Sequence, residues 1–251
     1  MGLSRRAISV ITLVAVSFLA SFTMSRLNDA VSQPHLVPGP LDARGFRVKA
    51  VDAETGAAVR YNPCEPLHYV INPALAPDGA IDDMHTAIRL TSEASGLKFV
   101  YDGTTEEVDL GTIRPTHQPD LYGERWAPIL ISWTNGLPAT DTAADAEGRR
   151  PIAAAGSNYE INDEGQAVYI TGSAAFDATV TDLQPGFGGE TWGQAMLHEL
   201  GHVVGLDHVD DPASVMNPVI GRRAASWGGA DRAGLWSQGI GSPCIKTPDL
   251  P

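Results

Sequence analysis

Three histidines and a glutamate near residue 200 have the spacing of a metal site that performs catalysis. The stretch 198–208 reads HELGHVVGLDH, so His198 and His202 are four residues apart and Glu199 follows the first of them. Residues four apart lie on one face of a helix, so the two imidazoles can bind the same metal ion. Gly205 can adopt the left-handed backbone that turns the chain and returns His208 as a third ligand.

Three imidazoles leave one position of a tetrahedral zinc ion open for water, which is the arrangement of catalytic zinc sites. Glu199 is placed to act as the general base, taking a proton from the zinc-activated water and passing it to the leaving group. The motif therefore predicts hydrolysis that depends on a catalytic zinc ion. A peptide bond is the substrate that we expect first.

A helix must present these side chains, and the sequence marks where it begins and ends. Thr191 is the expected N-cap and Gly205 the expected end, with buried apolar positions between them at Trp192, Ala195, Met196, Leu200 and Val203. A second, shorter helix is expected at 229–236, with Asp231 near its start as a capping residue.

A methionine follows the third histidine at short range. The stretch Ser214-Val215-Met216-Asn217-Pro218 is typical of a tight turn, because proline cannot continue regular structure. We expect Met216 to lie under the metal as an apolar floor, in preference to an ordinary loop position.

The chain upstream alternates between strands and a helix. Strands are expected at 46–51, 57–61, 67–72, 97–101 and 129–133, and a helix is expected at 81–95, before Gly96. Residues 159–162 and 167–171 flank a turn and predict a hairpin, and 135–151 reads as a surface loop. The edge of such a sheet is where a protease can pair with an extended polypeptide substrate.

An acidic loop contains Glu106, Glu107 and Asp109. Calcium would need oxygen ligands at a characteristic spacing, which this loop lacks. We therefore interpret it as a solvated face, and a calcium site stays unsupported.

Three regions follow from composition along the 251-residue chain. Residues 1–30 have a basic start and then an apolar run, which is typical of a signal peptide or an uncleaved signal anchor. Residues 31–45 are rich in proline and glycine and read as a linker, which leaves 46–251 as the zinc-binding domain. The net charge of -13 argues against nucleic acid or an anionic membrane surface as a partner. Membrane contact is expected only through the N-terminal anchor.

The motif and its surroundings resemble the matrixins, the metzincin family that includes matrix metalloproteases. The resemblance rests on His198, Glu199, His202, Gly205 and His208, followed by Met216 and Pro218, and is specific over about 185–236. It implies an α+β fold of the metzincin type, with a twisted mixed sheet, an antiparallel edge strand, an active-site helix and a small C-terminal subdomain. It also implies endopeptidase activity on extended polypeptides.

Two positions depart from the family pattern. Val209 stands where the family usually has serine after the third histidine, and Asn217 replaces the tyrosine between methionine and proline. The usual wall of the specificity pocket therefore cannot be carried over to this chain.

Cys64 and Cys244 are the two cysteines of the chain. Exported proteins tend to pair their thiols, so we expect a Cys64–Cys244 disulfide. The alternative is suggested by the family resemblance, in which a propeptide cysteine caps the zinc, and Cys64 loosely resembles such a switch.

The sequence thus predicts a monomeric zinc-dependent endopeptidase that is secreted or anchored facing the extracytoplasmic side. A non-catalytic, zinc-stabilised binding module on the cell surface is the alternative. The presence of Glu199 favours the enzyme, because a purely structural site needs no base. A zinc hydrolase acting on a non-peptide bond is a third, less favoured interpretation.

Overall fold

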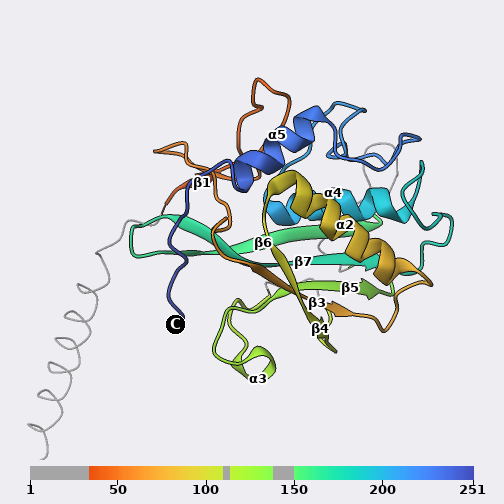
Figure 1. Cartoon of the computed structure of the whole chain (residues 1–251), viewed down its shortest axis with the longest axis horizontal. Helices are drawn as coiled ribbons and strands as arrows, with labels where there is room; N and C mark the ends of the chain where they lie inside the picture. The colour runs from red at the N-terminus through yellow and green to blue at the C-terminus, as the bar shows by residue number, and fades with distance from the viewer. Residues whose placement is uncertain (1–33, 110–113, 138–149) are drawn as a thin grey trace, which may run out of the picture.

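A five-stranded mixed sheet forms the centre of the fold (Figure 1). The computed structural model describes residues 34–109, 114–137 and 150–251. The sheet contains, in spatial order, β4 (Phe99–Thr104), β3 (Leu67–Asn72), β5 (Ile129–Thr134), β7 (Ala167–Asp177) and β6 (Ala153–Ile161). The first four strands are parallel to one another, and β6 pairs antiparallel with β7 at one edge. The predicted α+β class with an antiparallel edge strand is confirmed.

Three helices, α2 (Ala80–Ser95), α4 (Trp192–Val204) and α5 (Gly229–Gln238), lie on one side of the sheet, and the short α3 (Pro119–Tyr122) lies on the other (Figure 1). Parallel neighbours such as β3 and β4 need a crossover connection, and α2 supplies it. The predicted helix 81–95 is confirmed, since α2 ends at Gly96 with a left-handed φ of 73°.

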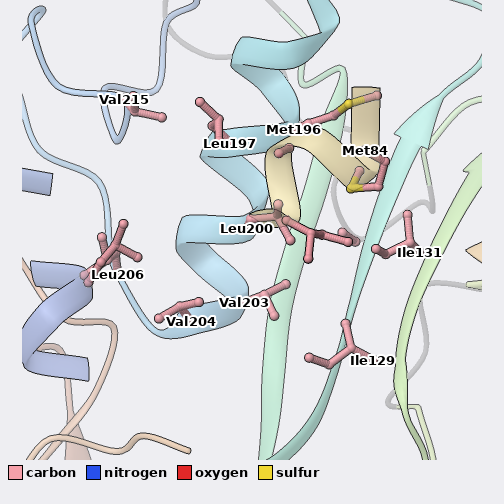
Figure 2. Close-up of a cluster of buried hydrophobic side chains, with 14 of the residues drawn as sticks. Met84, Ile129, Ile131, Met196, Leu197, Leu200, Val203, Val204, Leu206 and Val215 are labelled. Atoms are coloured by element: carbon pink, nitrogen blue, oxygen red, sulfur yellow. The ribbon is translucent and has the colours of Figure 1, made fainter. Parts of the chain in front are cut away.

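The main core fills the space between the sheet and the helices (Figure 2). Met196, Leu200 and Val203 of α4 lie toward β5 and α2, where Met84 and Ile131 meet them. Leu197 lies on the side of α4 that faces Val215. Because α4 is buried on both sides, its metal-binding face is held rigidly.

The first described residues pack against the domain. The predicted strand 46–51 is wrong in extent, because the regular pairing is limited to β1 (Leu36–Val37) with β2 (Val51–Asp52) and to isolated bridges around them. The Gly39 amide donates to the Val48 carbonyl at 3.2 Å. From residue 36 onward, the segment expected to be a linker is thus hydrogen-bonded to the domain.

The interpretation of the acidic loop as a solvated face is wrong for Glu107. Its side chain is 12% exposed and accepts two hydrogen bonds from Arg114, both at 2.8 Å. Tyr122 and Gln118 also donate to its carboxylate. The largely buried carboxylate of Glu107 therefore holds the segment between β4 and β5 in place through these hydrogen bonds.

A disulfide joins Cys64 to Cys244, with 5.5 Å between the Cα atoms. Both cysteines are used in this bond, so neither is a free thiol that could cap a metal. The predicted signal segment 1–30 and residues 138–149 of the predicted surface loop lie outside the described residues. Across the part that is described, no helix has the length and apolar character needed to cross a membrane.

Candidate active site

Helix α4 carries the first two histidines and the glutamate. Thr191 stands at the N-cap with an extended backbone, but its hydroxyl donates to the Gly189 carbonyl, so the predicted side-chain cap is absent. The helix ends as predicted at Gly205, whose φ of 108° lies in the left-handed region that favours glycine. His198 and His202 consequently project from successive turns of a helix with fixed ends.

Backbone pairing with the N-terminal segment positions the chain that carries His208. Beyond Gly205, the Lys49 amide donates to the Gly205 carbonyl at 2.8 Å, and the Asp207 amide donates to the Arg47 carbonyl at 2.9 Å. Gln238 of α5 also donates to the Gly205 carbonyl, at 3.2 Å. The turn is therefore held by segments far away in the sequence.

The three predicted ligands converge through their Nε2 atoms. His198 Nε2 lies 3.0 Å from His208 Nε2, and His202 Nε2 lies 3.1 Å from each of the other two. Nitrogens bound tetrahedrally to one zinc ion at its usual bond length are about 3.3 Å apart. The observed spacing comes within a few tenths of an ångström of that geometry.

Backbone carbonyls select the tautomer that exposes these nitrogens. His198 Nδ1 donates to the Val215 carbonyl at 2.7 Å, and His202 Nδ1 donates to the Leu206 carbonyl at 2.9 Å. With a proton on each Nδ1, the two Nε2 atoms present lone pairs to each other. That arrangement suits a cation held between them, so the donor atoms and their protonation fit a zinc ion.

Burial keeps the imidazoles neutral, which is the form that binds metal. Desolvation lowers the pKa of His198 to about 4 and that of His202 well below its usual value. The pKa of His208, on the more exposed side, is also lowered, again mainly by burial. Protons therefore compete little for these nitrogens near neutral pH.

Glu199 lies where a general base is needed. Its side chain is 6% exposed, and it lines the same cleft as His198, His202 and His208. The cleft has a volume of about 720 Å³ and is bordered on one side by residues 153–155 of the edge strand β6. Residues 217–220, which follow the methionine, border it on another side.

Met216 lies against the middle of the metal-binding segment. It is 2% exposed, and a Cβ added at Gly201, between the two helical histidines, would come within 2.3 Å of its Sδ. Only glycine admits the methionine this close. The turn 214–218 thus lies directly under the helix, with its apolar side chain toward it.

Val209 and Asn217, the two residues that differ from the family pattern, are joined by a hydrogen bond in this turn. The Val209 backbone amide donates to the Met216 carbonyl at 3.1 Å, and the side-chain Nδ2 of Asn217 donates to the Val209 carbonyl at 3.4 Å. Asn217 Oδ1 in turn accepts from the Val219 amide. Asn217 therefore braces the cleft wall through hydrogen bonds.

Asp231 caps α5, as predicted, and also holds the turn that carries Val215. It is buried on α5 and accepts from the Gly228 amide, the Val215 amide and the Ser214 hydroxyl. The carbonyl of the same Val215 accepts from His198, so Asp231 acts on a ligand through one intermediate residue. The acidic residue in the first turn was visible in the sequence, but its partners 16 and 17 residues upstream were not.

Comparison with known proteins agrees with the site geometry. No curated protein matches the chain. The sequence model of the Matrixin family matches residues 140–236, a range that extends upstream of the helix into the edge strand. The segment 140–236, which contains the converging histidines, the glycine turn and the methionine turn, is therefore similar to the matrixins.

Proposed function

We propose that this protein is an exported zinc endopeptidase that cuts extended polypeptides, with Glu199 as the general base. The observation that carries the proposal is the position of Glu199, buried in the cleft beside three converging imidazoles. Among the described residues, the cluster offers three protein ligands, whereas structural zinc sites usually close with a fourth. This favours catalysis over a zinc-stabilised binding module.

The edge strand supports an extended polypeptide as the substrate. Within the described residues, β6 is paired on one side only, with β7, and Ala153, Ala154 and Ala155 line the cleft. An exposed strand edge can hydrogen-bond an added strand, and small side chains leave room for it. The substrate backbone would then run past the histidines.

Different residues would bind the metal and transfer the proton. A bound zinc ion would supply Lewis acidity, lowering the pKa of water and polarising the scissile carbonyl. Glu199 takes the proton of the attacking water and delivers it to the leaving amine. His198 and His202 hold their orientation through the Val215 and Leu206 carbonyls, and His208 completes the set of donors.

Replacing Glu199 by alanine tests this assignment. We expect the Glu199→Ala protein to keep its zinc, because the three histidines remain, and to lose a factor of about 10² to 10⁴ in turnover. Metal analysis and digestion of an unfolded protein measure the two quantities. Glu164→Ala, at an exposed hairpin turn, is the control and should behave as wild type. Turnover near the wild-type level in Glu199→Ala would refute the proposal.

Export is part of the proposal and rests on separate support. The basic and apolar start of the sequence is typical of a secretory signal, and disulfides persist mainly outside the cytosol. Sequencing the N-terminus of protein recovered from the medium and from membranes distinguishes a cleaved signal from an anchor. Recovery from the cytosol alone would contradict export.

A further inference from the structure

Arg223 lines the cleft beside the histidines and is half-buried. Its Nη1 donates to the Pro212 carbonyl at 2.9 Å. The buried Gln194 amide, oriented to satisfy its neighbours, accepts from Nη1 at 3.2 Å and from Nη2 at 2.7 Å, while its nitrogen donates to the Gly189 and Gly221 carbonyls. The guanidinium is thus held in a fixed position by neutral groups.

The charge of Arg223 has no close counter-ion in the described part of the chain. Every hydrogen bond above is to a neutral oxygen, and no described carboxylate comes within 4.0 Å. These bonds use three of the five N–H donors of a guanidinium. Burial lowers the pKa of Arg223, whereas the more distant Asp231 and Asp211 raise it. A partly desolvated cation without a counter-ion interacts more favourably with an incoming anion than a cation that is already paired.

Apart from Glu199 beside the histidines, the other charged groups that line the cleft are exposed, and none of the described ones forms an ion pair with Arg223. Glu190 and Asp182, which also line the cleft, are exposed, and Glu190 lies 3.5 Å from Arg222. Lys49 and Arg150 are exposed cations on the lining. The lining also has apolar side chains from the same stretch of chain, those of Val215, Pro218, Val219 and Ile220.

We propose that Arg223 is a specificity-determining residue, which selects a substrate with an aspartate or glutamate side chain close to the bond that is cut. This inference rests on the proposed endopeptidase function and adds the substrate class. The apolar side chains of the lining accommodate the methylene groups of the acidic residue, and the fixed guanidinium receives its carboxylate. The terminal carboxylate of a short peptide has the same chemistry, so the test must separate the two sources.

The test uses the zinc-loaded enzyme and a peptide library blocked by acetyl and amide groups, which removes terminal charges. Within it, pairs of peptides differ only by Glu or Gln at each position around the cut. For wild type we expect kcat/KM to be on the order of 10-fold higher for Glu at one position, since charge-assisted hydrogen bonds are stronger than neutral ones. Arg223→Gln should bring that ratio close to one, and Arg223→Lys should keep part of it.

Arg222→Gln is the matched control, because it removes the same charge from the neighbouring residue, whose side chain is 94% exposed. It should keep the wild-type ratio. Equal cleavage of the Glu and Gln peptides by wild type would overturn the inference, as would a ratio unchanged in Arg223→Gln. A parallel set of the same peptides with a free C-terminus separates the two sources of carboxylate. Selection that appears only in that set would overturn the side-chain assignment. Failure of wild type to cut any peptide would instead contradict the proposed function itself.

Discussion

Two main-chain carbonyls determine where the protons of the helical histidines reside. Val215 and Leu206 both belong to the chain that follows α4, yet they accept from His198 and His202 on the helix. The ligands are thus presented by α4 and oriented by the segment after it. Such partners of the ligands typically contribute 10- to 100-fold to metal affinity.

Asp231→Asn tests this dependence. The amide nitrogen would face backbone N–H donors from Val215 or Gly228, or the Ser214 hydroxyl would lose its charged acceptor. We expect a loss of about 2 kcal/mol in the free energy of unfolding and a roughly 10-fold weaker zinc affinity. Chelator competition measures the affinity. Asp210→Asn, on the exposed surface, is the control, and equal affinities in both variants would contradict the role given to Asp231.

The sequence predicts those site residues that lie close to one another along the chain. His198, Glu199 and His202 lie within one helical turn or so of each other, and His208 follows a recognisable glycine turn. Arg223 and Asp231 depend on Gln194 and Val215, whose approach is created only by tertiary folding. No period or motif in the sequence encodes those contacts.

Among the elements, those with strong local patterns are predicted best. The expected strand 67–72 coincides with β3, and the run of apolar residues at 129–133 is the central strand β5. The segment 46–51 alternates like a strand, but its partners are the backbone of 205–207 on one side and short bridges on the other. Alternation indicates an extended chain and does not specify its partner.

Arg114 and Glu107 connect the segment between β4 and β5 to the sheet. Arg114 Nη1 donates to Thr171 of β7 at 2.6 Å, and the Arg114 carbonyl accepts from Asn158 of β6. Asn72 of β3 donates to the Glu107 carbonyl. Burial alone would raise the pKa of Glu107, but hydrogen bonds from Arg114, Tyr122 and Gln118 lower it below the usual value.

Glu107→Gln should destabilise the protein by about 3 kcal/mol at pH 7, because it leaves Arg114 buried without its counter-charge. A carboxylate with a lowered pKa stabilises the fold above its unfolded pKa, and this contribution is lost as pH falls through the folded pKa. The difference from wild type should therefore shrink below about pH 4. Denaturant titrations at both pH values measure it, with the neighbouring exposed Glu106→Gln as control. A difference independent of pH would contradict the ion pair as its source.

For the whole molecule, the disulfide is the longest covalent constraint, because it joins residues 180 positions apart. In the chain-entropy account, closing such a loop in the unfolded state contributes about 5 kcal/mol. We expect the Cys64→Ser, Cys244→Ser double variant to lose up to that amount in denaturant unfolding. Its zinc affinity in the folded state should stay unchanged, since neither cysteine lines the cleft. A double variant as stable as wild type would exclude this contribution.

The backbone ladder between residues 47–49 and 205–207 has a thermodynamic consequence for the whole chain. Through these hydrogen bonds, the docking of the N-terminal segment is coupled to the positioning of His208 as a ligand. Linkage is reciprocal, so whatever tightens metal binding must tighten that docking by the same factor. Loss of the segment by proteolysis should therefore weaken metal binding.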